Sequence, residues 1–321
     1  MRRLFVSIVV ACGCLTGVAT GADRYPTKPV RMVVPFPPGA ASDFLARTLG
    51  QKLNDLYGQQ IVIDNRPGAG GIVGSTLIAK AAPDGYTLGM VGQPHLLQPL
   101  LQKVPPYRPL DDIACVTQVA SLPNVLVVSP NLPVKSVADV IALAKAKPGQ
   151  LNFGSAGIGS SSHIAGEALK AAAGIDVVHV PFKLLSDIFS EMMAGRVQLY
   201  MFPLPAVMPM LKDSKLHVVA VGTSKPTPSL PGVPTMAESG LPGFQSESWF
   251  GVVATGGTSR TIVTQLNRDI ANILNTADVR ERFLRQGAEA AYGTPEEFRN
   301  LMQAEFAKYQ KLVKSAGIST Q

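Results

Sequence analysis

The amino-acid sequence predicts an α/β fold of two lobes, each a mostly parallel sheet flanked by helices. Over residues 30–91, short apolar runs alternate with amphipathic stretches of helical spacing, which is typical of a β-α-β-α-β unit. The alternation begins again after residue 130. Apolar runs near residues 120–125 and 249–254 join the two units. We therefore expect two crossover segments that form a hinge, with a cleft between the lobes.

The first unit has clear starts and stops. The apolar run at 30–34 predicts a strand, and leucines at helical spacing between about Asp43 and Gly58 predict the helix after it. The turn sequence Pro83-Asp84-Gly85 ends a second predicted helix. The other elements predicted here are a strand at 60–64, that second helix at 71–82 and a strand at 87–91.

The second unit is predicted from the same signals. Pro123 separates two apolar runs at 115–120 and 124–129, and Ser136 is placed to cap a helix. Residues 223–244 are rich in Pro and Gly and predict irregular structure. The remaining predictions are strands at 151–153, 177–180, 198–201 and 218–221, a helix beginning near His163, an apolar run at 249–254, and a last helix capped by Thr294-Pro295-Glu296-Glu297.

The N-terminus has the features of an export signal. Two arginines precede a short apolar run at 4–10, and the small residues Thr20-Gly21-Ala22 fit a cleavage site. The run is much shorter than the roughly 20 residues that a membrane span needs, which disfavours an uncleaved anchor. We expect a cleaved signal peptide at 1–22, with lipidation at Cys12 as the second alternative.

The two crossings set the expected domain boundaries. A first domain should comprise residues 23–122 plus 250–321, and a second should comprise residues 123–249. The 299 residues that would follow the signal peptide are enough for two modest domains.

Charge and cysteine usage exclude several classes of protein. The net charge of +7 is mild and there is no dense Lys/Arg tract, so no nucleic-acid partner is expected. Only Cys115 follows the signal, which excludes an internal disulfide and predicts a buried apolar thiol. The four histidines are scattered, and we expect no metal. The glycine run at 68–74 lacks the dinucleotide spacing, so no cofactor is expected.

Two loops of small residues each follow a predicted strand and open a helix. They are 35–43 and 154–163. Small residues let backbone N–H groups approach a ligand, and a helix N-terminus adds unpaired donors and partial positive charge. Such a place binds an anion without Arg or Lys. Hydroxyl groups in these loops come from Ser42, Ser155, Ser160 and Ser161.

Each loop taken alone is also consistent with an ordinary turn that has a serine cap. The pair, one on each lobe and facing a cleft, favours ligand binding. Asp43 and His163 are expected to support the loops and not to touch the ligand, because a carboxylate facing an anion would repel it. A hydrolase that uses Ser160 or Ser161 with His163 is an alternative, but no nucleophile elbow or partner acid is evident.

Several motifs in order along the chain carry a resemblance to a known family. They include Val34-Pro35-Phe36-Pro37-Pro38-Gly39 with Asp43, Asp64-Asn65-Arg66-Pro67-Gly68-Ala69-Gly70-Gly71, Ala82-Pro83-Asp84-Gly85-Tyr86-Thr87-Leu88, Ser155-Ala156-Gly157 through Ser162-His163, His179-Val180-Pro181-Phe182-Lys183, Leu230-Pro231-Gly232-Val233-Pro234-Thr235 and Ser248-Trp249-Phe250-Gly251. The chain resembles the substrate-binding receptors of tripartite tricarboxylate transporters, also called the Bug or TctC-like family.

The resemblance implies a type II-like periplasmic binding-protein fold, a small carboxylate as ligand, and integral membrane transporter subunits as partners of a monomeric receptor. It implies a protein that is not an enzyme. In the family the two loops grip one carboxylate, and more variable residues meet the other end of the ligand. The ligand-binding residues expected here are Phe36, Gly39, Ala40, Ala41, Ser42, Gln93, Ser155, Gly157, Gly159, Ser160, Ser161, Lys183 and Phe202.

The sequence departs from the family pattern at three places. Ala40 stands where the family usually has a second glycine, and Leu184-Leu185 follow Lys183 in place of small polar residues. Phe202-Pro203 replace a pair that is often Asp-Asn. These changes favour an apolar distal pocket and an aromatic or aliphatic acid, although Phe202 could instead pack inside. A sensor that presents its loaded lobe to a membrane kinase needs the same cleft and stays a second hypothesis.

Overall fold

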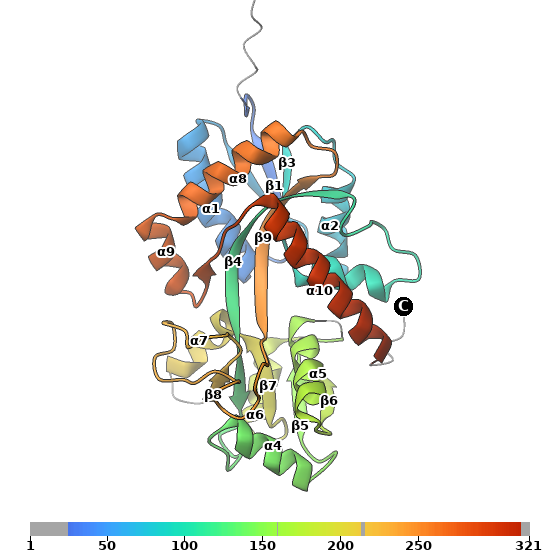
Figure 1. The fold of residues 1–321 in the computed structure, drawn as a ribbon, viewed down its shortest axis with the longest axis vertical. Coiled ribbons are helices and arrows are strands. Elements are labelled where there is room, and N and C mark those ends of the chain that lie inside the picture. Colours follow the sequence, from blue (N-terminus) through green and yellow to red (C-terminus); the bar gives the residue numbers. More distant parts are fainter. Residues whose placement is uncertain (1–24, 159, 213–215, 316–321) are drawn as a thin grey trace, which may run out of the picture.

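The computed structural model describes residues 25–158, 160–212 and 216–315 (Figure 1). The expected signal peptide at 1–22, with Cys12, and the expected site residue Gly159 lie outside these ranges. The described chain forms an upper and a lower group of helices, and one long sheet runs through both groups (Figure 1).

The sheet has the strand order β2-β1-β3-β9-β4-β7-β5-β6, and β8 and β10 pair with β4. β2, β1 and β3 are parallel to one another, as are β7, β5 and β6. β9 and β4 lie between these sets and run antiparallel to their neighbours, so the sheet is mixed. The strands are β1 (Val30–Val34), β2 (Ile61–Asn65), β3 (Thr87–Gly92), β4 (Ile113–Val128), β5 (Asn152–Ser155), β6 (Val178–Pro181), β7 (Leu199–Pro203), β8 (His217–Val221), β9 (Glu247–Thr255) and β10 (Glu289–Ala290).

The helices cover the faces of the sheet, and α1, α2, α4, α5 and α10 begin close to where the sequence predicts, whereas the other helices had no prediction. Thr294 and Glu297 cap the last helix reciprocally, with N···O distances of 2.7 and 3.1 Å, as expected for a capping box. The helices are α1 (Ala41–Tyr57), α2 (Ile72–Ala79), α3 (Gln93–Leu97), α4 (Val137–Ala146), α5 (Ser161–Ala173), α6 (Leu185–Met193), α7 (Leu204–Lys212), α8 (Arg260–Leu274), α9 (Ala277–Leu284) and α10 (Pro295–Ser315), with 3-10 turns at Ala69–Gly71 and Gln98–Leu101.

The two apolar runs that flank Pro123 form one strand, β4, instead of two separate elements. A proline normally interrupts a central strand because it has no N–H to donate. Here Pro123 opposes Glu247, where the ladder to β9 ends, and the ladder to β7 begins at the next residue, Asn124. The proline therefore stands where β4 changes partners, and β4 connects the upper and lower halves of the molecule (Figure 1).

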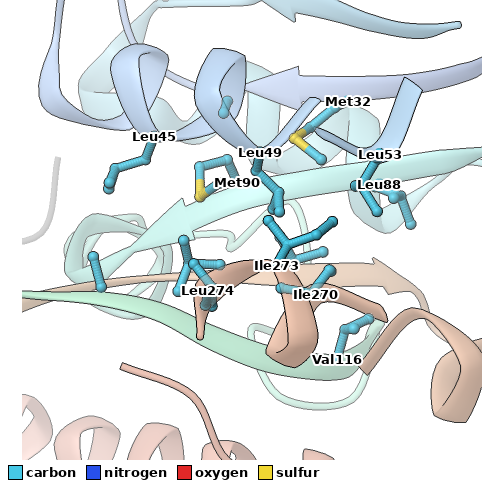
Figure 2. Packing of buried hydrophobic residues seen from close by; sticks show 14 of the residues in the cluster. Met32, Leu45, Leu49, Leu53, Leu88, Met90, Val116, Ile270, Ile273 and Leu274 are labelled. Carbon is cyan, nitrogen blue, oxygen red and sulfur yellow. The ribbon is translucent and has the colours of Figure 1, made fainter. Parts of the chain in front are cut away.

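The buried apolar side chains form separate clusters above and below this point. In the upper half, leucines of α1 and isoleucines of α8 pack with Met32 of β1 and Met90 of β3 (Figure 2). In the lower half, one cluster lies under α4 and α5 and another under α6 and α7. Ile164 of α5 is an exception, because it packs with Trp249 and Tyr309 of the upper half. The halves thus also meet through α10.

Candidate functional site

A cavity of about 460 Å³ lies where the carboxyl ends of the parallel strands of the two halves face each other. From the upper half it is lined by the loop after β1 and the start of α1, by α3, and by the start of β9. The side chains and backbone here include Phe36, Ala40, Phe44, Gln93, Trp249 and Phe250. The volume lies within the range of small-molecule pockets.

The lower half contributes the ends of β5 and β7 and the helices that follow. Ser161 lies at the start of α5, and Phe202 and Pro203 end β7. The others are Leu185, Pro205 and Ala206. None of the described residues that line the cavity carries a charge, and most are apolar. An anion here must be held by neutral donors, which are backbone N–H groups, hydroxyls, side-chain amides and the indole of Trp249.

An ionised carboxylate holds the first loop. Asp43 Oδ2 accepts the backbone N–H of Gly39 at 2.9 Å and the Nε–H of Arg47 at 3.0 Å. Asn65 donates to Asp43 Oδ1 at 2.9 Å and to the backbone oxygen of Phe36 at 3.1 Å. Burial raises the pKa of Asp43, but hydrogen bonds from Arg47, Gly39 and Asn65 outweigh it and leave the pKa below its ordinary value. Asp43 therefore bonds to the backbone of the loop at Gly39.

Neutral groups hold the second loop. Ser155 is fully buried, and its Oγ lies 2.6 Å from His179 Nε2 and accepts the N–H of Gly157 at 3.1 Å. Ser162 Oγ accepts the N–H of Ala156 at 3.0 Å. Ser160 Oγ accepts the backbone N–H of His163 and so caps α5.

Two histidine rings stack beneath this loop. The rings of His163 and His179 have centroids 4.0 Å apart, and Phe153 stacks on His179 at 4.8 Å. Burial lowers the pKa of His179 to about 4, with further lowering by His163 and Lys170. Burial also lowers the pKa of His163. Both rings are therefore neutral near pH 7, and neither belongs to the lining of the two cavities.

Two helix N-termini open on the cavity from opposite halves. α1 begins at Ala41 and α5 at Ser161, and both residues line the cavity. Helix geometry leaves the first N–H groups of each without an acceptor inside the helix. Ser42 Oγ is buried and has no hydrogen-bond partner among the described residues. Ser42 itself belongs to neither cavity lining, but the two helix starts can offer backbone donors and partial positive charge to an anion.

The structure brings together many of the expected site residues, but not all. Those that line the cavity are Phe36, Gly39, Ala40, Ala41, Gln93, Ser161 and Phe202. Ser160 lines a second cavity, which shares Phe36, Pro94 and Ser161 with the first. Ser155 is buried and bonded to His179, and Gly157 and the exposed Lys183 lie outside both linings.

Sequence reasoning missed several lining residues. Ser248, Trp249 and Phe250 lie in a motif recognised in the sequence, but the motif did not indicate that they face the ligand cavity. Ser248 Oγ can donate a hydrogen bond to Gln93 Oε1, at 3.3 Å, or to Asn124 Oδ1, at 3.1 Å. These contacts connect β9 to α3 and β4. Gln286 and Ala288 follow α9 in a turn far along the chain, and no local signal marks them.

The described residues contain neither a candidate metal site nor a candidate membrane span. The His, Cys, Asp and Glu side chains there form no group of three or more that could hold a metal ion. No helix in the described ranges is sufficiently long and apolar to cross a bilayer.

Comparison with known proteins gives the family. The sequence model described as "Tripartite tricarboxylate transporter family receptor" matches residues 45–318. The chain belongs to this family. A protein encoded in the tcbD-tcbE intergenic region of Pseudomonas sp. (strain P51) is 36% identical over 97% of this chain and 93% of its own. BugT of Bordetella pertussis is 36% identical over 99% of this chain and 98% of its own.

Solved structures of similar proteins agree with this fold. A protein of R. palustris, solved with adipate, has a TM-score of 0.81 and 37% identity, covering 92% of this receptor and 99% of that chain. MatC of Rhodopseudomonas palustris, with bound malate, has a TM-score of 0.76 and 30% identity, covering 90% and 100%. The periplasmic binding protein BugD has a TM-score of 0.77 and 29% identity, covering 92% and 100%. The receptor therefore has the two-lobed binding-protein architecture that the sequence predicts.

Proposed function

We propose that this receptor binds a small carboxylate with an apolar aliphatic or aromatic body and delivers it to the membrane subunits of a tripartite transporter. The observation that carries the proposal is the uncharged cavity flanked by the N-termini of α1 and α5. The helix starts suit one carboxylate, and the apolar remainder suits a hydrocarbon body. The similar proteins solved with adipate and with malate support a carboxylate as the ligand class.

The lining of the lower half argues against a strongly polar ligand. Phe202 stacks on Tyr200 with ring centroids 4.7 Å apart and still reaches the cavity. Pro203 beside it has no N–H to offer. A second carboxylate placed against Phe202, Pro203 and Leu185 would lose its hydration without gaining a cationic partner, which is costly. We therefore favour one anionic group on each ligand.

The remaining expectations form part of the same proposal. We propose a cleaved signal peptide at 1–22, a monomeric mature protein in the periplasm, and domains at 23–122 plus 250–321 and at 123–249. The separate apolar clusters above and below Pro123 support these boundaries. We also propose binding without catalysis. Ser160, a nucleophile considered from the sequence, uses its Oγ to accept the backbone N–H of His163.

A thermal-shift screen of the mature protein tests the proposal. The acids are hexanoate, benzoate, adipate, aspartate and citrate, with hexylamine as a control that replaces the carboxylate with a cation. A ligand that binds only the folded state raises the melting temperature in proportion to the logarithm of its concentration above Kd. We expect shifts with hexanoate or benzoate and none with hexylamine. Shifts confined to aspartate and citrate would refute the apolar pocket, and no shift with any acid would refute carboxylate binding.

A further inference from the structure

The turn between α9 and β10, residues 285–288, forms part of the lining of the ligand cavity, and its Gln286 is also exposed to solvent. Gln286 and Ala288 line the cavity from the upper half, and Pro205 and Ala206 at the start of α7 line it from the lower half. These residues are absent from the lining of the second cavity, which meets the first at Phe36, Pro94 and Ser161. The turn therefore lies away from the junction where Ser161 begins α5.

At this turn the two halves touch with no space for a side chain. Gly287 has a φ of +71°, and a Cβ there would lie 3.0 Å from Leu204 Cγ and 3.3 Å from the backbone N of Pro205. Such distances are shorter than most real Cβ contacts. Only glycine combines this backbone conformation with so close an approach. Leu204 itself is fully buried, so the contact cannot relax simply by moving it into solvent.

A second contact anchors the turn across the cleft. Thr227 Oγ1, in the irregular segment of the lower half, donates to Glu289 Oε1 at 2.7 Å. On its other side, Glu289 pairs with Ser121 of β4, close to the point where β4 changes partners. The turn is thus held by the central sheet and by the lower half together, which makes it a fixed wall.

We propose that this turn is the end wall that sets the length of the ligand, with Gln286 as the specificity-determining side chain that the far end of the ligand meets. This inference rests on the proposed function. Gln286 presents a neutral amide. The amide can lie against a terminal methyl group or hydrogen-bond a hydroxyl or carbonyl group, but it offers no positive charge to a second carboxylate. Because Gly287 has no side chain, the turn can lie directly against the start of α7. The ligand class is then a monocarboxylate of limited chain length.

Calorimetric titration with straight-chain acids tests the wall. Hexanoate and octanoate differ by two methylenes, and hexanoate and adipate differ only in the terminal group. Gln286→Ala removes the end of the wall, so we expect the ratio of octanoate to hexanoate affinity to rise by about tenfold, the value of two buried methylenes. Gln286→Arg adds a cation at the same place and should raise the ratio of adipate to hexanoate affinity. Loss of stability alone would not change these ratios.

Gly287→Ala tests the contact with α7, and Gly243→Ala is its matched control. Gly243 has a similar φ of +76°, but a Cβ there would have nothing within 4 Å. Both variants carry the same backbone strain, so a larger loss of hexanoate affinity in Gly287→Ala reports the closed wall. If the affinity ratios are unchanged in both Gln286 variants and the two glycine variants lose equal affinity, the end-wall proposal is refuted and the proposed function still stands. A wild-type protein that binds none of the acids would refute the proposed function itself.

Discussion

The two loops that face the cavity are similar in shape but are held by different chemistry. Each follows a parallel strand and ends at a helix N-terminus, Ala41 in α1 and Ser161 in α5. The first is held by the charged Asp43 together with Arg47 and Asn65. The second is held by serine hydroxyls and a neutral histidine stack.

The difference shows that a loop at a helix N-terminus can be held either by a charged group or by neutral groups. The carboxylate of Asp43 points to the backbone of its own loop, and its charge is matched by Arg47. On the other side, the low pKa of His179 keeps its ring uncharged at neutral pH. The two loops should therefore respond differently to mutation and to acid, and these responses can be measured separately.

The largest effect is expected from Asp43→Ala. Removing this buried carboxylate leaves the N–H of Gly39 without its acceptor and removes one acceptor from each of the Asn65 and Arg47 side chains. We expect the free energy of unfolding to fall by about 2–4 kcal/mol, measured by chemical denaturation. Asp55→Ala, an exposed position on the same helix, is the control and should change it by less than about 0.5 kcal/mol. Equal losses in the two variants would contradict the supporting role of Asp43.

A smaller effect is expected from acid on the second loop. The pKa of His179 in the folded protein, about 4, lies below its ordinary value, so the unfolded chain binds the extra proton first. The stability contributed by the neutral ring is complete above about pH 6.5 and is lost as pH falls toward 4. The slope for one such group is at most about 1.4 kcal/mol per pH unit, and partial exposure reduces it. The first loop should keep its support through this window, because the pKa of Asp43 is also lowered.

The comparison of wild type with His179→Gln isolates this contribution. Burial lowers the pKa of His95 to about 4 and also lowers that of His163, so both contribute pH dependence of the same sign. Glu167 opposes the shift of His163, and Lys170 adds to it. The glutamine amide can still bond Ser155, so the variant should fold and show a flatter stability profile between pH 6.5 and 4. Identical profiles for the two proteins would rule out titration of His179 as a source of the dependence.

Much of the fold follows from local sequence signals because the elements are strongly patterned. The helix start at Thr294, the cap at Ser136 and the irregular segment after Thr223 are confirmed. The continuity of β4 through Pro123 could not be predicted, because it depends on which strands pair on either side of that residue. Pairing partners far along the chain leave no trace in a local pattern.

The site shows the same division between local and distant information. The two loops are visible in the sequence because their small residues and helix starts are contiguous. Gln286 and Ala288 reach the cavity only because α9 and β10 return beside β4, more than 150 residues after it. Ser155 is expected to be a ligand donor from its place in a motif, and in the structure its buried Oγ lies 2.6 Å from His179 Nε2. Side-chain direction in such a loop is fixed by tertiary packing.

The smallest predicted effect compares the two helix caps directly. Ala40 and Ser160 occupy the same position before α1 and α5, with φ and ψ of −68° and 161° against −74° and 160°. Only Ser160 has a hydroxyl that accepts a helix N–H. Ser160→Ala should therefore cost about 1 kcal/mol of unfolding free energy, and Ala40→Ser should add from a few tenths to about 1 kcal/mol. Denaturant midpoints of both variants measure this. If Ala40→Ser gives no gain, backbone similarity alone does not make the two loops equivalent.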